Sequence, residues 1–479
     1  MPAVCEPPSL ERRVLNSESI SPKARTMDYQ HDRTVCIIGL GYVGLTLAII
    51  MAEAGYTVWG VEINQDFTDK IVTGKAHFYE PGLDERLGHQ LQAGRLLVVN
   101  SLPSDPAVSL YIITVGTPLG PDGRVRMDMV KRVTMEIAAQ LKDGDAVVLR
   151  STVKIGTTRD VVQPILDETG CDIDIGFCPE RTLEGRALYE LTHLPQIIGA
   201  NSERGSIRLA QVFNALTPTV IRVRDPETAE MIKLIDNTSR DVGFAFANEV
   251  ARLCGAVGIS AAEVITFGKL GYARTQLPMP GPVGGPCLSK DGHILVESML
   301  DRGVMPEIAA AARTINERLM VEVAEYLADQ VKPWYRTKSL KVTVMGLAFK
   351  GQPETNDLRG STAIPLLAEL RRLLPEARFC GYDPIVSAQD MIGLGLAPMA
   401  DLNEAFDGSH LVIIHNNHPA FQGMPLSQLS RGMARPGIVY DFWNSFIPER
   451  LTLEDGVRYV ALGTHRMGVD VTASVPEPV

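Results

Sequence analysis

The sequence predicts an α/β protein built from two doubly wound domains that a long central helix joins. Short apolar runs alternate with helical patterns in the first third of the chain and again in the last third, which is typical of parallel sheets covered by helices. Between them lies one helical pattern, 227–257, that is long for a globular protein. We therefore expect an extension at 1–33, sheet domains at 34–222 and 331–479, and a central helical domain at 223–330.

Composition and charge exclude several classes of protein. With 45% hydrophobic and 22% charged residues, the 479-residue chain has the make-up of an ordinary globular protein. Its net charge of −11 argues against nucleic-acid binding. The sequence has no apolar run of membrane-spanning length and no secretory signal, and its seven cysteines include no C-x-x-C pair. We expect a cytoplasmic protein without a disulfide framework or a metal site, and a disordered segment at 1–33.

A glycine-rich turn in the first domain predicts a dinucleotide site. The apolar run at 34–38 leads directly into the segment Gly39-Leu-Gly41-Tyr42-Val43-Gly44, and a helical pattern follows. The first glycine permits a tight turn, the second lets the backbone approach a pyrophosphate, and the third permits close packing of helix on strand. The helix N-terminus then faces the phosphates. This combination of strand, turn and helix predicts a Rossmann-like domain.

An acidic residue at the end of the second strand predicts which cofactor binds. Glu62 follows the run at 56–61 and lies about twenty residues beyond the glycine turn, where a carboxylate accepts hydrogen bonds from ribose hydroxyls. A carboxylate there repels a 2′-phosphate, so the pattern favours NAD over NADP. Thr117 and Thr152 lie in loops that follow later strands, at the sheet edge where ligands bind. Turn and helix-cap roles are the alternative for these threonines.

Two polar patterns near the middle of the chain are candidates for acid–base or oxyanion chemistry. Lys233 and Asn237 are four residues apart on the long helix and therefore share a face, from which both can donate to an oxyanion. Glu180 and Glu184 lie in the polar loop 177–185, where carboxylates can transfer protons. The alternative for all four is a solvated surface position.

The segment 280–291 predicts a reactive cysteine. Glycines and prolines surround Cys287, with Lys290 and Asp291 three and four residues later. If a helix begins at this loop, the three side chains share a face. A helix N-terminus and a nearby cation both lower the pKa of a thiol. A buried structural cysteine is the alternative.

The last third predicts a second Rossmann-like domain that lacks the fingerprint glycines of the first. A strand at 340–345 leads into a turn that carries Lys350, and Arg359 precedes the next helix. Both cations are natural partners of a phosphate group. This domain is therefore expected to bind an anionic nucleotide other than NAD.

Taken together, the motifs resemble the UDP-glucose/GDP-mannose dehydrogenase family of nucleotide-sugar 6-dehydrogenases. The resemblance covers about residues 34–465 and rests on motifs that occur in one order: Gly39-Leu-Gly-Tyr-Val-Gly44, Ser151-Thr152-Val, Pro179-Glu180, Lys233-x-x-x-Asn237, Gly284-Gly285-x-Cys287-x-x-Lys290-Asp291, Phe349-Lys350 and Asp357-Leu-Arg359. It implies NAD-dependent oxidation of C6 of a nucleotide sugar to a carboxylate, which supplies polysaccharide precursors, and a dimer formed through the central helices.

The resemblance also implies a role for each motif residue. Cys287 captures the aldehyde and later holds a thioester, while Lys233 and Asn237 stabilise the oxyanion. Asp291 transfers protons together with Thr152. The remaining implied roles are thioester hydrolysis and substrate placement by Glu180 and Glu184, cofactor binding by Gly39, Gly41, Tyr42, Val43, Gly44, Glu62, Thr117, Thr152 and Lys290, and UDP-sugar binding by Arg181, Arg274, Gly284, Gly285, Phe349, Lys350 and Arg359.

The substrate pattern is mixed. Arg181 after Pro-Glu, and the segment around Arg274, are similar to the branch that acts on UDP-N-acetyl-D-mannosamine. Lys290 is more typical of the UDP-glucose branch, and Glu184 departs from the proline that N-acetylmannosamine enzymes often show, so UDP-glucose 6-dehydrogenase is the main alternative. A β-hydroxyacid dehydrogenase would explain the Lys/Asn helix but not the cysteine loop or the last domain. A non-catalytic nucleotide-binding relative would be expected to have lost Cys287, Lys233 or Asp291.

Overall fold

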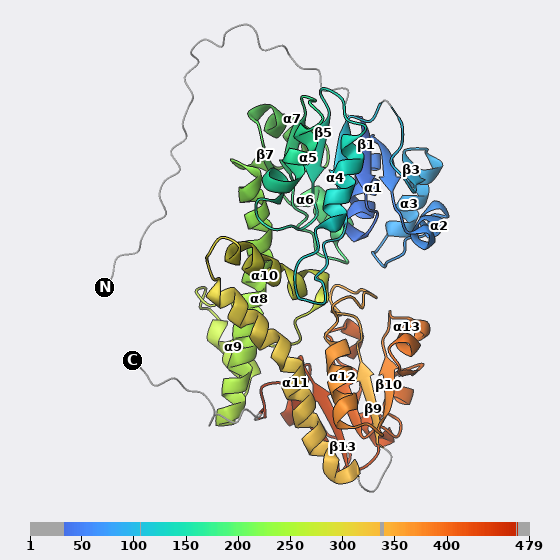
Figure 1. Ribbon diagram of the computed structural model, residues 1–479. Coiled ribbons are helices and arrows are strands. Elements are labelled where there is room, and N and C mark those ends of the chain that lie inside the picture. Colours follow the sequence, from blue (N-terminus) through green and yellow to red (C-terminus); the bar gives the residue numbers. More distant parts are fainter. Residues whose placement is uncertain (1–32, 106, 336–339, 466, 468–479) are drawn as a thin grey trace, which may run out of the picture.

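The computed structural model describes residues 33–105, 107–335, 340–465 and 467. It consists of two sheets covered by helices, one at each end of the molecule, with a set of long helices between and beside them (Figure 1). The predicted α/β fold with two Rossmann-like sheets and a long central helix is confirmed. The extension predicted to be disordered lies outside the described residues, apart from Arg33.

The first sheet has eight strands in the order β3-β2-β1-β4-β5-β6-β7-β8, and only the β6–β7 pair is antiparallel. Its strands are β1 (Thr34–Ile38), β2 (Thr57–Val61), β3 (Leu96–Val99), β4 (Leu110–Ile113), β5 (Ala146–Leu149), β6 (Asp174–Phe177), β7 (Gln196–Ala200) and β8 (Val220–Arg222). The helices of this part are α1 (Tyr42–Glu53), α2 (Gln65–Val72), α3 (Leu83–Gln92), α4 (Asp128–Ala138), α5 (Gln163–Asp167) after a π-helical turn at Thr158–Val162, α6 (Ala187–His193) and α7 (Glu203–Asn214).

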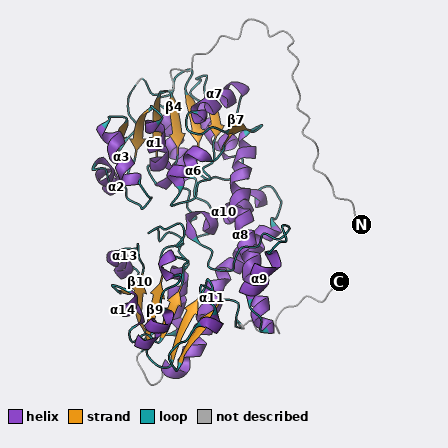
Figure 2. Ribbon diagram, turned by 180° about the vertical axis from the view of Figure 1, so that it is seen from behind, coloured by secondary structure: helices purple, strands orange, loops and turns teal. Residues whose placement is uncertain are grey.

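Both faces of this sheet are buried, which explains why its strands read as continuous apolar runs. In β1, Val35 and Ile37 belong to a core on one face, whereas Cys36 and Ile38 belong to a second core on the other. The parallel strands deliver their carboxyl ends to one edge, and this edge faces the middle of the molecule (Figure 2). The loops with the predicted cofactor residues are therefore brought together at that edge.

The central part is helical and is organised around α8 (Pro226–Val257), with α9 (Ala261–Lys269), α10 (Gly285–Leu300) and α11 (Glu307–Tyr335). Asp225 caps α8 by accepting a hydrogen bond from the Thr228 N–H at 2.8 Å, and Pro226 occupies the first turn. Gly258 ends the helix in a left-handed conformation, φ 76°. Helix α11 continues to Tyr335, so the first residues of the range expected for the second sheet domain, 331–335, still belong to this helix.

The second sheet has six parallel strands in the order β11-β10-β9-β12-β13-β14, which repeats the order of strands 3-2-1-4-5-6 in the first sheet. Its strands are β9 (Lys341–Met345), β10 (Arg378–Tyr382), β11 (Ala397–Pro398), β12 (Leu411–Ile414), β13 (Gly437–Asp441) and β14 (Val457–Ala461). Its helices are α12 (Ala363–Leu373), α13 (Ala388–Gly393), α14 (Leu402–Phe406) and α15 (Leu426–Leu429), with 3-10 turns at Pro419–Phe421, Ser430–Gly432 and Pro448–Arg450.

The core of the second sheet extends into the long helices. Leu319, Val323 and Leu327 of α11 pack with Val342 and Val344 of β9 in one buried cluster. This packing fixes the second sheet against the central helices. Among the helices of the described residues, none has the length and apolarity needed to cross a membrane.

Candidate active site

The glycine turn between β1 and α1 has the geometry that a dinucleotide requires. Gly39 has φ +96°, a conformation that favours glycine. A Cβ added to Gly44 would lie 1.9 Å from the Gly39 carbonyl oxygen, so only glycine allows this packing of helix on strand. A Cβ at Gly41 would meet nothing within 4 Å, which leaves open space beside the turn for a pyrophosphate. Tyr42 and Val43 form the first turn of α1, whose N-terminus faces that space.

Glu62 is fixed at the end of β2 in the position expected of a ribose ligand. One carboxylate oxygen accepts the Leu40 N–H of the glycine turn at 3.0 Å, and the other accepts the Asn64 N–H at 2.9 Å. Each oxygen keeps a lone pair for a ribose hydroxyl. These residues therefore fit NAD.

Hydroxyl side chains connect the loops that follow neighbouring strands at the same edge. Thr114 donates to the Gly39 carbonyl at 2.7 Å, and Ser151 donates to the Val115 carbonyl at 2.7 Å. Thr117 donates to the carbonyl of Thr152 at 2.5 Å. These bonds link the glycine turn to the two loops that carry the predicted threonines.

The segment 280–291 around Cys287, the cysteine loop, docks directly on the second sheet domain. The Gly285 N–H donates to the Gly360 carbonyl at 2.8 Å. A Cβ at Gly284 would lie 2.4 Å from that same oxygen, and one at Gly285, whose φ is +93°, would lie 2.4 Å from the Phe349 ring. Gly284, Gly285 and Phe349 therefore bring two domains into contact, a reason for the glycines that sequence reasoning did not anticipate.

Cys287 lies in the first turn of α10, which begins at Gly285, and the residue as a whole is exposed in the single chain. Four charged side chains act on the thiol, those of Lys233, Asp291, Lys290 and Glu184. The expected lowering of the thiol pKa is not found. Desolvation by the surrounding protein raises the pKa of Cys287, and Lys233 and Lys290 offset only part of that rise.

Two residues from different helices meet beside the thiol. The Asn237 side chain of α8 donates to an Asp291 oxygen of α10 at 2.6 Å, and both side chains are buried. The ammonium of Lys290 lies 3.6 Å from the other Asp291 oxygen and donates to Thr117 at 3.4 Å. Lys233 is buried one turn before Asn237, and it forms no hydrogen bond or ion pair with any described residue. Its ammonium is therefore available to a bound group.

Glu180 is held as a structural anion. Its carboxylate forms an ion pair with buried Arg150 at 2.7 Å and accepts the N–H groups of Arg181 and Thr182 at 2.8 and 2.9 Å. Desolvation raises the pKa of Glu180, but Arg150 and the Thr182 N–H outweigh that effect and leave the pKa below its usual range. A carboxylate so firmly ionised and so fully bonded is a poor acceptor of a further proton.

Glu184 has the opposite character. It is buried at the contact between the two sheet domains, where Thr355 donates to it at 2.6 Å. Desolvation and the nearby charge of Asp357 raise its pKa to about 7. Lys350 donates to the Glu184 carbonyl, and desolvation lowers the pKa of Lys350 to about 8. Glu184 can thus exchange a proton near neutral pH, as a general base must.

The three predicted arginines differ in position. Arg359 is largely exposed and forms a 2.6 Å ion pair with Asp357. It is also close enough to the first domain to add to the desolvation that lowers the pKa of His77. Arg181 pairs with Asp236 of α8 at 3.3 Å. Arg274 is exposed and lies over the ring of Tyr272 at 4.7 Å, without a hydrogen bond or ion pair to any described residue. In a single chain Arg274 is not joined to the residues around Cys287.

Sequence reasoning missed several residues of this site. Arg150 directly precedes the Ser-Thr motif, but nothing in its spacing predicts the ion pair with Glu180. Glu80 accepts the Gly185 and Ala187 N–H groups at 2.7 and 2.8 Å and thereby holds the loop that carries Glu184. Arg240 follows Asn237 by three residues on α8, and its charge reaches Lys350. Helical spacing from Asn237 could have identified Arg240.

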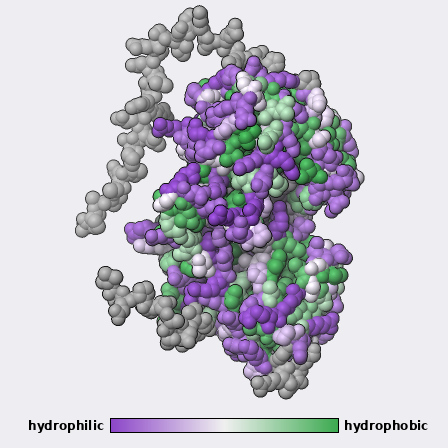
Figure 3. All heavy atoms as spheres, viewed as in Figure 1, coloured by the Kyte–Doolittle hydropathy of each residue, from purple (hydrophilic) through white to green (hydrophobic). Residues whose placement is uncertain are grey.

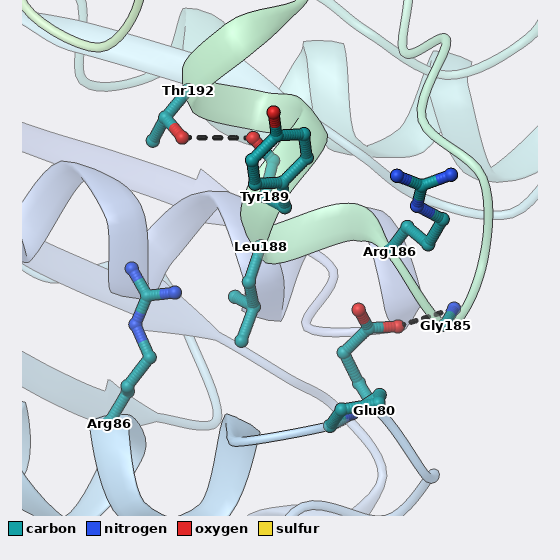
Figure 4. A pocket seen from close by; sticks show the side chains of 8 residues that line it. Glu80, Arg86, Gly185, Arg186, Leu188, Tyr189 and Thr192 are labelled. Carbon is teal, nitrogen blue, oxygen red and sulfur yellow. Dashed lines mark hydrogen bonds between the residues drawn. The ribbon is translucent and has the colours of Figure 1, made fainter.

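A hollow of about 400 Å³ lies on the first domain between α3 and α6. Arg86, Arg186 and Tyr189 contribute to its lining, and Figure 4 shows the Gly185 N–H directed at Glu80 on its margin. Neither the glycine turn nor Cys287 lines it. In the described part of the chain, no group of three or more His, Cys, Asp or Glu side chains is arranged to hold a metal ion.

The order of the domains agrees with comparisons to known proteins. Three models of the UDP-glucose/GDP-mannose dehydrogenase family match: the NAD binding domain at 33–217, the central domain at 227–318 and the UDP binding domain at 343–448. The chain belongs to the UDP-glucose/GDP-mannose dehydrogenase family. It is thus an NAD-dependent nucleotide-sugar dehydrogenase with a UDP-binding domain.

Individual relatives support this membership. A UDP-N-acetyl-D-mannosamine dehydrogenase of Pyrococcus horikoshii is 31% identical over 411 residues, 85% of this chain and 94% of that protein. The solved structure of the enzyme of that name from the same organism has a TM-score of 0.80 at 29% identity and covers 90% of this chain and 100% of its own. A UDP-glucose dehydrogenase of Pyrobaculum islandicum has a TM-score of 0.77 at 26% identity, with coverage of 93% and 100%.

Proposed function

We propose that this protein oxidises the C6 hydroxyl of a UDP-sugar to a carboxylate in two NAD-dependent steps, with Cys287 as the covalent nucleophile. UDP-N-acetyl-D-mannosamine is the favoured substrate, and the uronic acid product serves polysaccharide synthesis. The observation that carries the proposal is that charged side chains from three segments act on the Cys287 thiol: Lys233 of α8, Lys290 and Asp291 of α10, and Glu184 of the loop after β6. A cysteine with a purely structural role has no need of this set.

The bond changes follow from the chemistry of an alcohol and a thiol. NAD, when bound, accepts one hydride in each oxidation. The alcohol first loses its hydroxyl proton and a hydride and becomes an aldehyde, to which the Cys287 sulfur adds to give a thiohemiacetal. Loss of a second hydride leaves a thioester, and water cleaves it to the carboxylate and the free thiol. The sum is one alcohol, one water and two NAD converted to one carboxylate, two NADH and three protons.

The side chains around the thiol suit these steps. The Lys233 ammonium and the Asn237 amide are placed to donate to the oxygen that carries negative charge in the addition step. Asp291 accepts a hydrogen bond from Asn237 at 2.6 Å and lies 3.6 Å from the Lys290 ammonium, contacts that orient its carboxylate beside the cysteine for proton transfer. Because desolvation raises the pKa of the Cys287 thiol, its proton must leave during attack, and Asp291 is the carboxylate whose charge acts on the thiol most strongly.

We assign thioester hydrolysis to Glu184 and substrate placement to Glu180. A general base works best with a pKa near the working pH, and the pKa of Glu184 is about 7. Glu180 is committed to Arg150 and two backbone N–H groups. Its ion pair fixes the loop that leads to Glu184.

The choice of sugar rests on the relatives and on the Pro-Glu-Arg sequence at 179–181. The similar protein of Pyrococcus horikoshii is named for UDP-N-acetyl-D-mannosamine and shares 31% identity. The structure named for UDP-glucose shares 26%. UDP-glucose is the second candidate because Lys290 is typical of that branch and Glu184 departs from the proline that N-acetylmannosamine enzymes often show.

We also propose that the protein is a cytoplasmic homodimer that pairs through the central helices. The outward face of α8, α9 and the following loop exposes large apolar side chains: Phe246, Leu253, Val257, Val264, Phe267, Leu270 and Tyr272. Green side chains reach the surface near α9 in Figure 3. Such a patch is typical of a protein interface. All cysteines of the described residues are free, which is typical of a reducing compartment.

An assay of NADH against sugar consumed tests the proposal. With UDP-N-acetyl-D-mannosamine, UDP-N-acetylglucosamine and UDP-glucose supplied separately, we expect the first to give the highest kcat/KM and two NADH per sugar. One NADH per sugar would contradict the four-electron reaction. A higher kcat/KM with UDP-glucose would assign the protein to the second candidate.

A further inference from the structure

A buried polar network holds the backbone of the cysteine loop at both ends. At the first end, the side-chain amide of Asn248 pairs with Gly281 in both directions. The Gly281 N–H donates to Asn248 Oδ1 at 2.8 Å, and Asn248 Nδ2 donates to the Gly281 carbonyl at 3.1 Å. Asn248 is buried in α8, so this pair replaces contacts that the loop would otherwise make with water.

The network continues from Asn248 into α11 and back to α8. Asn248 Nδ2 also donates to Asn316 Oδ1 at 3.0 Å. Asn316 Nδ2 in turn donates to Asp241, to the backbone carbonyl at 3.0 Å and to the carboxylate at 2.9 Å. All three side chains are about 1% exposed. Each amide group is thus fixed in orientation by partners on both sides.

The second end of the loop is held through a guanidinium. Arg313 of α11 donates to the Leu288 carbonyl at 2.5 Å, directly after Cys287, and pairs with Asp241 at 3.2 Å. The guanidinium is buried, and α10 comes so close that a Cβ on Gly292 would lie 3.0 Å from the Arg313 side chain. Asp241 therefore connects the two anchors of the loop, because it binds both Asn316, which contacts the Asn248 partner of Gly281, and Arg313, which binds Leu288.

Helical spacing connects this network to the catalytic side chains. Asp241 follows Asn237 by four residues on α8, and Asn248 follows Asp241 by seven. Residues at such spacing share one helix face. One face of α8 thus presents Asn237 to Asp291 and, further along, holds the loop that carries the thiol.

We propose that Asn248, Asn316, Asp241 and Arg313 form a clamp that positions Cys287 against Lys233 and Asn237. The four are positioning residues, since none of them contacts the sulfur. The inference rests on the proposed role of Cys287 as nucleophile. An apolar core of the same size can be as stable as a buried polar network, so stability alone gives no reason for polar side chains here. Their role in this proposal is to place the loop. A displacement of about 1 Å in a reacting group can slow catalysis about 100-fold.

The test compares Asn248→Ala and Asn316→Ala with Ser409→Ala. Ser409 is fully buried in the second domain, bonds to Thr343 at 2.9 Å and lies far in sequence from the loop, so its variant controls for lost stability. All are assayed with NAD and the UDP-sugar well below their Tm. We expect Asn248→Ala to lower kcat about 10- to 100-fold with KM changed less than about threefold, and Ser409→Ala to keep both.

Hydrogen exchange of the peptide that spans residues 281–288 gives a readout that needs no catalysis. In Asn248→Ala this peptide should exchange faster than in the wild type and in Ser409→Ala, because the Gly281 N–H loses its acceptor. In the Asn248→Ala/Asn316→Ala double variant, the loss of kcat should be smaller than the product of the single losses. Wild-type exchange of the loop, or a wild-type kcat, in Asn248→Ala would overturn the clamp.

A parallel Cys287→Ala enzyme separates the two hypotheses. If that enzyme still produces acid at the wild-type rate, the proposed function fails, and the clamp is then judged on loop exchange alone. If Cys287→Ala is inactive while Asn248→Ala keeps wild-type kcat, the clamp fails and the proposed function stands.

Discussion

At the scale of single residues, the local environment gives the titratable groups around Cys287 distinct roles. Glu180 and Glu184 are four positions apart in one loop and look equivalent in the sequence. Glu180 meets a buried guanidinium and its pKa falls, whereas Glu184 is desolvated beside the Asp357 carboxylate and its pKa rises to about 7. Desolvation also raises the pKa of the Cys287 thiol despite two nearby lysines. Roles of this kind depend on partners brought together by folding.

The pKa of Glu184 predicts how acid formation depends on pH. A general base must be deprotonated, and the pKa of Glu184 is about 7, so the hydrolysis rate should be low below pH 7 and should rise through it. Glu184→Gln should lower kcat at least about 100-fold and remove this rise. Single-turnover formation of acid between pH 5.5 and 8.5 is the measurement. If the rate of acid formation still rises near pH 7 in Glu184→Gln, the rise belongs to the titration of another group.

At the scale of elements, short connections decide where the chemistry lies. The glycine turn places the N-terminus of α1 at the sheet edge, and the Gly284-Gly285 turn starts α10 against the second domain. Helix α8 presents one polar face to Asp291 of α10 and to Gly281 at the start of the cysteine loop. The sequence predicted these turns because glycine spacing and helical period are local signals. It could not predict that Gly285 abuts Phe349, since that contact depends on how two domains pack.

Gly285→Ala tests the docking of the cysteine loop. The substitution combines a positive φ with a Cβ 2.4 Å from the Phe349 ring, so it should cost at least about 1 kcal/mol of unfolding free energy and lower kcat. Gly88→Ala in α3 is the matched control, because its Cβ would meet nothing within 4 Å. Alanine there should be neutral or stabilising. Thermal unfolding and steady-state kinetics compare the two, and equal effects would contradict the docking role.

At the scale of the whole molecule, two nucleotide-binding sheets face each other across a helical centre. The presence of two sheet domains was visible in the sequence as two series of apolar runs, and so was the long helix between them, whereas the strand order comes from the structure. The contact between the domains was not visible, because it consists of hydrogen bonds that form only after the domains pack. The Tyr79 N–H donates to Asn356, and both Lys350 and Thr355 donate to Glu184. Pairing with a second chain likewise leaves no periodic signal beyond exposed apolar residues.

A charge on the apolar face of the central helices should disrupt the proposed dimer. Leu270 is 77% exposed in the single chain, and Leu270→Asp would place a carboxylate in an apolar interface. We expect this variant to be monomeric by light scattering after size exclusion. Ile447→Asp, on the second domain and 52% exposed, is the control and should keep the wild-type mass. A wild type that is itself monomeric at micromolar concentration would contradict the dimer.

The central claim is that the sugar becomes attached to Cys287 during the reaction. Mass spectrometry of rapidly quenched enzyme, mixed with NAD and the UDP-sugar, measures this directly. Hydrolysis should be slowed by Glu184→Gln, so that variant should accumulate the adduct. We predict a mass increase equal to the substrate in its thioester form, confined to the peptide that contains Cys287 and absent from Cys287→Ser. Quenched enzyme that forms NADH while this peptide stays unmodified, together with undiminished acid formation by Cys287→Ala, would contradict the account.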